Sequence, residues 1–365
     1  MRGLYIHIPF CKYICSYCDF PKLVSKSSNH KTYIYELIKE IESYKDKLND
    51  IDTVYIGGGT PNSLDLSLLE ELLINIHSYL KNSKESTIEL NSELITEDLA
   101  KLLIRYNISR VSIGVQTLDE KSINLLNRQH NKEIVKNSIN LLREYGINNI
   151  NIDLIFGIPY TDINTIKEDL DFILSLNPNH LSYYSLILED RTIFSHLVAK
   201  NKLKLLDDDI IADMYDYINN RLEGFGYKHY EISNYAKPGY ESIHNKLYWE
   251  SKEYIGVGLG ASGYIDSYRY TNYKDLKNYY EHKIEENIFI DENERKKEYL
   301  MLGLRLTDGV SISKYTSIFK SDIFTDFSLD KLIKNKLIMV DGDYIKICKD
   351  KLFIANLIFE EFVGD

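Results

Sequence analysis

Three cysteines near the N-terminus are the residues of this 365-residue chain whose spacing points most directly to chemistry. Cys11, Cys15 and Cys18 are separated by three and then two residues, on a predicted loop that directly follows the strand-like segment Leu4–Ile8. Three thiolates are one ligand fewer than a 4Fe–4S cluster has irons, so one iron stays free to bind a small chelating molecule. The spacing therefore predicts a 4Fe–4S cluster with an open coordination site.

A structural zinc site is the alternative for the same thiolates. Zinc in such a site prefers a closed tetrahedral set of ligands, so His7 or His30 would have to supply the fourth. His7 lies inside the predicted strand and His30 is twelve residues beyond Cys18, and neither spacing is typical of zinc. The remaining cysteine, Cys348, is isolated, and we interpret it as a small buried hydrophobic residue.

A glycine-rich segment and several polar residues follow the predicted strands. Gly57-Gly58-Gly59-Thr60-Pro61 comes directly after a strand, and backbone without side chains lets a ligand approach closely. Taken one at a time, each of these polar residues is explained equally well as a solvent-facing strand residue or as part of a structural salt bridge. Buried acids in apolar strands are unfavourable unless they are paired or bound to a ligand. Together these residues predict a ligand site: Glu89, Gln116, Arg128 and Asp153.

Parallel strands must bring these residues together. Short β-branched or aromatic runs alternate with amphipathic helical segments, in a unit that repeats about every 35 residues. The pattern predicts an α/β fold, a partial (β/α)6 barrel with its site at the carboxyl ends of the strands. Six units do not close a full barrel, so downstream chain or a large ligand must cover the open side. The predicted strands are Leu4–Ile8, Thr53–Ile56, Thr87–Leu90, Arg110–Val115, Asn149–Ile155 and Leu181–Leu186.

The downstream chain changes in character. One more helix is expected from Asp207 to Phe225, followed by an irregular stretch, expected to be functional, from Tyr227 to about Tyr273. Helical periodicity returns after Glu292, and a hairpin is expected around Asp341–Gly342. The sequence thus predicts three parts: a barrel over residues 1–225, a connecting region over 226–290, and a small, mostly helical, winged-helix-like C-terminal domain over 291–365.

Composition excludes several classes of function. The formal net charge of −11 repels polyanions, so no nucleic acid partner is expected. The chain contains no apolar run of 18 residues, so no integral membrane segment is expected. The N-terminus lacks the pattern of a secretory signal, which predicts a cytoplasmic location.

The cysteine spacing resembles the CxxxCxxC signature of the radical SAM superfamily, in which the amino and carboxylate groups of S-adenosylmethionine (SAM) chelate the open iron. Tyr5-Ile-His7-Ile-Pro9-Phe10-Cys11 resembles the YxHIPFC opening of one branch. That branch contains oxygen-independent coproporphyrinogen III oxidase (HemN) and the HemW haem chaperones. The resemblance extends over nearly the whole chain, and it implies a radical SAM barrel with SAM as a cofactor.

The resemblance also implies which residues contact SAM. Gly57–Pro61 is similar to the GGGTP motif that cradles the methionyl part, and Tyr17 stands where an aromatic ring packs on the adenine. The segments IEL, SIGVQ, LNR and NIDLIFGIP are similar to later SAM-contacting segments of the family. The implied contacts are Tyr5, Tyr17, Gly58, Gly59, Thr60, Glu89, Gln116, Arg128 and Asp153.

Two features resemble the HemW type more than the oxidase. Cys18 is followed by Asp19-Phe20, as in CxxxCxxCxF, where the oxidase carries a further cysteine two positions on. The chain starts ten residues before Cys11, so the N-terminal extension that helps the oxidase to enclose its porphyrinogen is expected to be absent.

A third feature is the segment from His244 to Trp249, which is similar to the HNxxYW motif of HemW. From the residues alone, hydrogen bonds that fix a loop and aromatic side chains in the core are the favoured interpretation. The resemblance instead implies a haem site at His244, Asn245, Tyr248 and Trp249. The iron ligand stays open, because His229 and Tyr230 are alternatives to the His244 imidazole.

The resemblance therefore implies a haem chaperone that binds a 4Fe–4S cluster, SAM and haem and delivers haem to haem-accepting proteins. The alternative is a radical SAM oxidoreductase of the oxygen-independent coproporphyrinogen III oxidase type. tRNA modification fits the cysteine motif but not the acidic charge of the chain.

Overall fold

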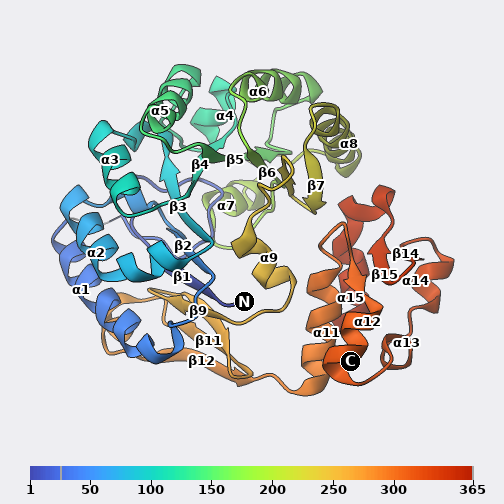
Figure 1. Ribbon diagram of the computed structural model, residues 1–365. Coiled ribbons are helices and arrows are strands. Elements are labelled where there is room, and N and C mark those ends of the chain that lie inside the picture. Colours follow the sequence, from blue (N-terminus) through green and yellow to red (C-terminus); the bar gives the residue numbers. More distant parts are fainter. Residues whose placement is uncertain (25–26, 364–365) are drawn as a thin grey trace.

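The computed structural model describes residues 1–24 and 27–363. Its centre is a sheet of parallel strands that curves into an open barrel, with helices on the outside (Figure 1). β1 to β6 lie side by side in chain order, and every neighbouring pair is parallel. These strands are β1 Gly3–Ile8, β2 Thr53–Gly58, β3 Glu85–Asn91, β4 Arg110–Gln116, β5 Asn149–Phe156 and β6 His180–Ser185. The predicted partial barrel and its strands are confirmed.

The outer helices bury one apolar stripe each against the strands. In α2, Leu69, Leu73, Ile76 and Leu80 recur at helical spacing and are buried, which is why this segment packs as a helix. Side-chain caps define several helix starts, among them Thr96, whose hydroxyl accepts the Leu99 N–H. The helices of this layer are α1 Ser27–Ser43, α2 Leu66–Asn82, α3 Glu97–Arg105, α4 Glu120–Leu125, α5 Lys132–Glu144, α6 Ile163–Ser175 and α8 Asp208–Gly224. The short helix α7 Ile193–Ala199 lies inside this ring, where the Phe194 N–H donates to the Ser16 carbonyl of the cysteine loop (3.0 Å) (Figure 1).

The chain downstream of the barrel helices extends both edges of the same sheet. β7 and β8 form a hairpin beside β6, while β9 pairs in parallel with β1 and continues into β10, β11 and β12. The elements of this region are β7 Lys228–Glu231, β8 Asn234–Ala236, α9 Ile243–Trp249, β9 Tyr254–Val257, β10 Ser262–Ile265, β11 Tyr268–Asn272, α10 Leu276–Tyr280 and β12 Ile284–Phe289. The expectation of irregular backbone from Tyr227 to about Tyr273 is wrong. These strands are only three to six residues long, so local patterning carries little signal.

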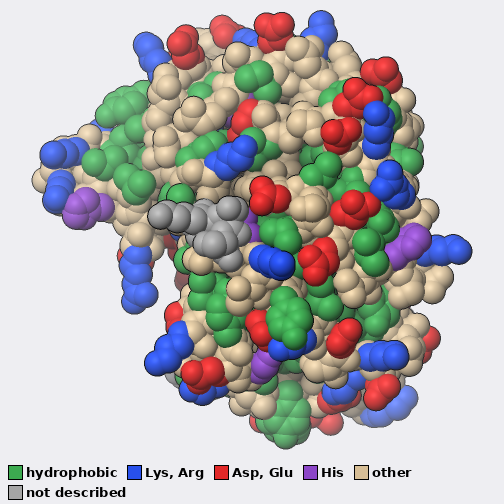
Figure 2. Space-filling model, turned by 90° about the vertical axis from the view of Figure 1, so that its left-hand side faces the viewer, with side chains coloured by type: hydrophobic (Ala, Val, Ile, Leu, Met, Phe, Trp, Pro, Cys, Tyr) green, Lys and Arg blue, Asp and Glu red, His purple; other side chains and the backbone are tan. Residues whose placement is uncertain are grey.

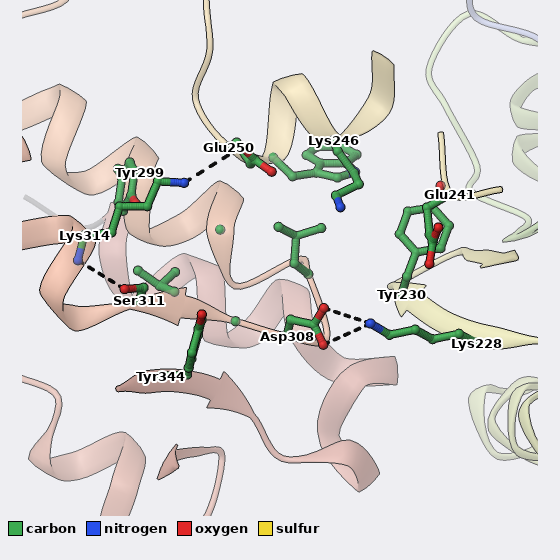
Figure 3. A pocket seen from close by; sticks show the side chains of 15 residues that line it. Lys228, Tyr230, Glu241, Lys246, Glu250, Tyr299, Asp308, Ser311, Lys314 and Tyr344 are labelled. Carbon is green, nitrogen blue, oxygen red and sulfur yellow. Dashed lines mark hydrogen bonds and ion pairs between the residues drawn. The ribbon is translucent and has the colours of Figure 1, made fainter. Parts of the chain in front are cut away.

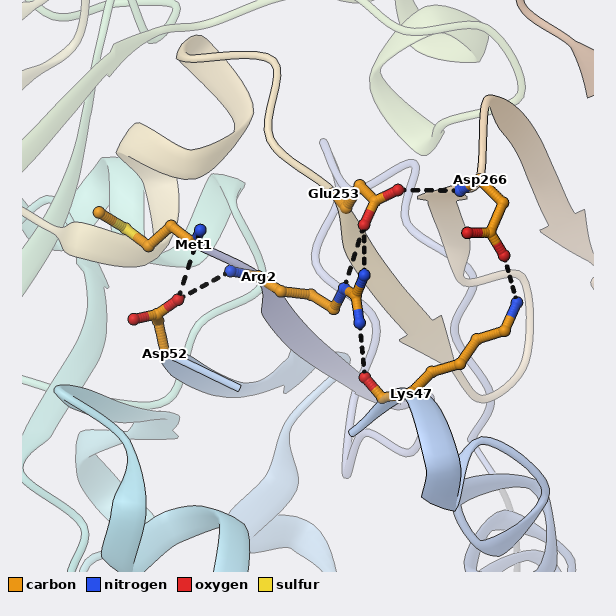
Figure 4. A network of polar contacts seen from close by, with 6 residues as sticks. All are labelled: Met1, Arg2, Lys47, Asp52, Glu253 and Asp266. Atoms are coloured by element: carbon orange, nitrogen blue, oxygen red, sulfur yellow. Dashed lines mark hydrogen bonds and ion pairs between the residues drawn. The ribbon is translucent and has the colours of Figure 1, made fainter. Parts of the chain in front are cut away.

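Polar contacts fasten β1 to the added strands. The Arg2 guanidinium donates to Glu253 (2.5 Å), just before β9, and to the Lys47 carbonyl (2.9 Å). The Lys47 ammonium in turn reaches Asp266 (2.6 Å), in the turn between β10 and β11 (Figure 4). Asp52 accepts the Arg2 N–H (2.9 Å) and so attaches the start of β2 to the same network.

The C-terminal residues form a smaller unit beside the barrel (Figure 1). Helices pack around a three-stranded sheet of order β13-β15-β14, and β14 and β15 form the predicted hairpin at Asp341–Gly342. A mostly helical C-terminal domain is confirmed. Its elements are α11 Glu292–Gly303, β13 Val310–Ser311, α12 Ile312–Phe319, α13 Ile323–Asp326, α14 Asp330–Lys334, β14 Ile338–Asp341, β15 Tyr344–Ile347 and α15 Ala355–Val363.

The surface carries charges of both signs. On the face shown in Figure 2, Lys and Arg side chains are interspersed with Asp and Glu. Within residues 1–24 and 27–363, none of the helices combines the length and apolar character needed to cross a bilayer. The predicted limits of three parts stay a prediction: residues 1–225, 226–290 and 291–365. Strands of the second part, β7 to β12, belong to the same sheet as the barrel strands.

Candidate functional site

The carboxyl ends of the barrel strands surround a cavity of about 360 Å³. Most residues that the sequence singles out for the cluster and SAM lie on its wall. They come from the cysteine loop, from the segment after β2 and from β3, β4 and β5 or just beyond. The predicted residues on the wall are Cys11, Cys15, Cys18, Tyr17, Gly58, Gly59, Thr60, Glu89, Gln116, Arg128 and Asp153.

Backbone hydrogen bonds hold the cysteine loop over this cavity. The Cys11 N–H donates to the Leu23 carbonyl (3.0 Å), and the Ser16 N–H donates to the Leu126 carbonyl (3.1 Å). Two side chains approach the sulfur atoms: the Thr60 hydroxyl is 3.7 Å from the Cys11 Sγ, and an Arg128 nitrogen is 3.7 Å from the Cys15 Sγ. The three thiols are therefore presented to one space, next to hydrogen-bond donors suited to thiolates or to cluster sulfur.

The surroundings of the loop fit an iron–sulfur cube better than a single zinc ion. Both ring nitrogens of His7 are engaged, one with the Tyr5 hydroxyl (2.9 Å) and one with the Pro21 carbonyl (2.8 Å). Burial lowers the His7 pKa to about 4, so the ring is neutral. Its hydrogen bond to the Pro21 carbonyl helps to fix the cysteine loop. His30, the other candidate for a fourth zinc ligand, packs against Phe10, with ring centroids 4.1 Å apart, and is not on the cavity wall. A cube takes each thiolate at a separate corner and leaves one iron open.

Glycines are required in the segment after β2. A Cβ on Gly59 would lie 2.8–2.9 Å from backbone atoms of Ile8, Pro9 and Phe10, and one on Gly58 would lie 2.5 Å from the His7 ring. Gly58 also has a φ of +110°, which side chains rarely adopt. The glycines thus let this segment lie directly against the start of the cysteine loop.

Glu89 places a carboxyl group on the cavity wall. It accepts hydrogen bonds from the Tyr55 hydroxyl (2.8 Å) and from the Gly58 N–H (3.0 Å). Burial raises its pKa to about 7, and the negative charge of Asp153 adds to the rise, while the two hydrogen bonds oppose it. A positively charged group arriving in the cavity would favour the carboxylate, so this side chain is suited to bind an amine.

The end of β4 is held in a strained conformation. Gln116 has a φ of +72°, and the pairing of β4 with β5 shifts between Gly114 and Gln116. Non-glycine residues in this region concentrate at ligand sites, because surrounding contacts must maintain the strain. Arg128 supports this turn by donating to the Gly114 carbonyl and to the Asn91 side chain (3.1 Å).

Asp153 and the two tyrosines complete the predicted set. The Asp153 carboxylate accepts the Ser112 hydroxyl (2.8 Å) and the Asn151 amide (2.8 Å), and burial raises its pKa. Tyr17 packs against a small apolar cluster beside the cavity that includes Leu126 and Phe194. Tyr5, on β1, does not line the cavity. Its ring lies beside that of Tyr55 on β2, with the ring centroids 6.1 Å apart.

Sequence reasoning missed other polar residues of the wall. They alternate with buried apolar residues along strands that are otherwise hydrophobic, so a period of two within each strand was the available signal. The sequence does not indicate which of the two faces of each strand lines a cavity. These residues are Tyr55, Asn91, Ser112, Asn151, Ser182 and Tyr184.

The segment predicted for haem forms α9, which separates the barrel cavity from a second cleft. Asn245 faces the barrel cavity, whereas Tyr248 and Trp249 line the cleft toward the C-terminal helices. His244 is buried between them, with its ring nitrogens bonded to the Thr53 hydroxyl (2.7 Å) and the Tyr248 hydroxyl (2.8 Å). Burial lowers its pKa to about 3. As an iron ligand, His244 would have to give up one of these hydrogen bonds.

The alternative iron ligands are also engaged. The His229 Nε2 is hydrogen-bonded to the Ile232 carbonyl (3.1 Å), and the Tyr230 hydroxyl is bonded to His180 (2.8 Å). Both residues belong to β7 and are buried.

Comparisons with known proteins agree along the whole chain. The sequence profile of the Radical SAM superfamily matches residues 5–173, and that of the HemN C-terminal domain matches residues 290–347. Heme chaperone HemW of Lactococcus lactis subsp. lactis is 36% identical, with 100% of this chain and 98% of the relative covered. Heme chaperone HemW of Bacillus subtilis is 34% identical, with 100% of both chains covered.

A solved structure shares the fold. Coproporphyrinogen III oxidase (HemN) from Escherichia coli superposes with a TM-score of 0.86, covering 99% of this chain and 89% of that one, at 22% identity. Superfamily membership implies a 4Fe–4S cluster and SAM, which agrees with the residues gathered at the cavity. The full-length similarity to the relatives shows that this chain belongs to the HemW family of the radical SAM superfamily.

Proposed function

We propose that this protein is a haem chaperone that binds a 4Fe–4S cluster, SAM and haem and delivers haem to haem-accepting proteins in the cytoplasm, without a nucleic acid partner. The observation that carries the first part is that Cys11, Cys15 and Cys18 share one cavity with Glu89 and the glycine segment. The names of the relatives, which are similar over their full length, support haem as cargo.

In this proposal the three cysteines hold the cluster and the cavity wall holds SAM. A bound cluster with an open iron supplies a chelation point for the SAM amino and carboxylate groups and an electron that can cleave the sulfonium. Backbone at Gly58, Gly59 and Thr60 receives the methionyl part, and Glu89 pairs with its amino group. Tyr17 packs on the adenine, and Tyr5 is a further contact from β1. Gln116, Arg128 and Asp153 supply polar contacts.

Haem is assigned to α9 in the same proposal. Tyr248 and Trp249 offer aromatic surface at the cleft, and His244 and Asn245 connect that surface to the barrel. This arrangement places haem outside the SAM cavity, with one helix between the two ligands.

Anaerobic reconstitution tests the cluster. The wild-type protein is expected to bind about four irons and to change its electron paramagnetic resonance signal when SAM is added, because SAM occupies the open iron. Cys15→Ser is expected to lose most of the iron, and Cys348→Ser, the matched control, to keep it. Stoichiometric zinc, or a cluster unaffected by SAM, would contradict the proposal.

Absorption titrations with haem test the cargo site. The wild-type protein is expected to bind haem in a saturable way, and Trp249→Ala and His244→Ala are expected to weaken binding or change the spectrum. Unchanged spectra and affinities in both variants would mean that α9 is structural only.

An activity assay separates the chaperone from the oxidase. Reconstituted protein incubated anaerobically with SAM, reductant and coproporphyrinogen III is expected to form no protoporphyrinogen. Formation of that product would replace the chaperone by the oxidoreductase alternative. Transfer of bound haem to an apo-haemoprotein, followed by its absorption spectrum, tests delivery directly.

A further inference from the structure

The cleft beyond α9 is a separate cavity of about 520 Å³, between the added strands of the barrel sheet and helices α11 and α12. Small-molecule sites commonly have volumes of about 300–1,000 Å³. The cleft is therefore large enough to hold a sizeable organic ligand.

Aromatic rings form much of its wall. Tyr248 meets Tyr254 edge to face, with ring centroids 4.7 Å apart, and Trp249 lies next to Tyr248. Phe319 of α12 faces them across the cleft from the C-terminal domain. Flat rings on opposite walls suit a planar, aromatic ligand, because dispersion and stacking act over its whole face.

Two cations that line the cleft have no acidic partner: Lys252, just before β9, and Arg295 of α11, which lies over the Phe319 ring (5.8 Å). Arg269 is neutralised by Glu298, to which it donates two hydrogen bonds (2.5 and 2.9 Å). In contrast, among the residues that the structure describes, no carboxylate lies within ion-pair distance of the Lys252 ammonium or the Arg295 guanidinium. A ligand that brings two carboxylates would supply the missing partners.

The other cavities are less suited to such a ligand. The cavity on the opposite side of Trp249 has a volume of about 200 Å³, and two of its cations are already paired (Figure 3). Lys228 contacts Asp308 (2.8 Å), and Lys314 contacts Glu250 (3.9 Å). The barrel cavity carries the buried carboxyl groups of Glu89 and Asp153, which disfavour further negative charge.

We infer that this cleft is the tetrapyrrole site, with Lys252 and Arg295 binding the two carboxylates of the macrocycle and Tyr248, Trp249 and Phe319 packing on its faces. The inference rests on the proposed haem binding and adds the charged groups that anchor the ligand. Carboxylate anchoring does not depend on the metal, so metal-free protoporphyrin binds in the same cleft.

Fluorescence and absorption titrations with haem and with metal-free protoporphyrin test the inference. The double variant Lys252→Glu/Arg295→Glu is expected to bind both at least about tenfold more weakly, because two charge-assisted contacts become repulsive. The control Lys297→Glu/Lys331→Glu has the same change in net charge at two exposed ion pairs outside the cleft, and is expected to bind like the wild type.

A second probe needs no variant. The dimethyl ester of protoporphyrin, which lacks both charges, is expected to bind the wild-type protein at least about tenfold more weakly than the diacid. If haem binds the wild type but the charge reversal and the esterification leave affinity unchanged, the cleft assignment is overturned while haem binding stands. If the wild type binds no haem, the proposed function itself fails.

Discussion

Glu89 is a carboxyl group whose ionisation the fold opposes. Its pKa of about 7 lies above the ordinary value of 4.5, chiefly because of burial. Between these two pH values the folded state holds a proton that the unfolded chain has lost. Stability therefore falls as pH rises from about 4.5 to about 7. The same carboxyl gains a counterion when an amine enters the cavity.

The variant Glu89→Gln tests both effects. An amide has no charge to bury, so the melting temperature of the protein without cofactors is expected to fall less between pH 5 and pH 8 than in the wild type. Affinity for SAM is expected to drop at least about tenfold, because the amine loses its anion. Melting curves measure the pH dependence of stability, and SAM titrations measure the affinity. Glu144→Gln, at an exposed helix position, is the control; equal melting behaviour of all three proteins would contradict the assignment.

At the scale of elements, the segment after β2 and the cysteine loop depend on one close approach. Gly59→Ala places a methyl group within 2.8–2.9 Å of backbone atoms of residues 8–10, so the start of the loop must move. Reconstituted Gly59→Ala is expected to hold less than about half the iron of the wild type. Iron and sulfide analysis measures this loss.

The control for this variant is Gly224→Ala at the end of α8. A Cβ at Gly224 meets nothing within 4 Å, and the backbone there is not left-handed. Full iron content in both alanine variants would show that the loop tolerates the displacement.

Helix α9 is attached to the barrel through Glu85 on β3. This buried carboxylate accepts the N–H groups of Ile243 (3.2 Å) and His244 (3.0 Å) at the start of the helix. Glu85→Gln keeps the shape but removes the charge that favours a helix N-terminus, and is expected to lower the free energy of unfolding by about 1–2 kcal/mol.

Trp249, the only tryptophan, reports the local effect of this change. Its emission is expected to shift to longer wavelength in Glu85→Gln as α9 loosens and water reaches the ring. Urea unfolding supplies the global value, and Glu71→Gln on the exposed face of α2 is the control. An unchanged emission spectrum would mean that other contacts fix α9.

At the scale of the whole molecule, the network around Arg2 joins β1, β2 and the turns next to β9 and β10. Arg2→Ala is expected to lower the free energy of unfolding by about 1 kcal/mol, more than an isolated surface pair contributes. The loss should shrink in 1 M salt, because the groups are partly exposed. Lys331→Ala, which breaks an exposed pair with Glu361, is the comparison. Equal effects of the two variants would show that the network has no joint role.

The barrel could be predicted from the sequence because each of its units carries a local signal. The strands from β1 to β6 are short runs rich in β-branched or aromatic residues, and the helices between them repeat apolar residues at helical spacing. The cysteine spacing and Gly57–Pro61 were recognisable for the same reason: their residues are neighbours in the chain.

Other features depend on contacts between distant residues. Nothing local to His244 indicates its bond to Thr53, which lies on β2, or that α9 separates two cavities. The strand pattern places Tyr55 and Asn151 on one face of their strands but does not tell which face lines a cavity, because that depends on how the sheet curves. Among the strands after the barrel, β8 and β9 are placed by pairing with β6 and β1, which are distant in the sequence.

The pairing of β1 with β9 has a consequence for folding during synthesis. Gly3 lies opposite Tyr254, so the strand that leads into the cysteine loop waits for about 250 further residues before its second neighbour exists. Until then a growing chain has an unpaired sheet edge next to the cysteine loop, and such edges promote association between chains. Ribosome-bound chains that end before β9 are therefore the form of this protein most prone to aggregation.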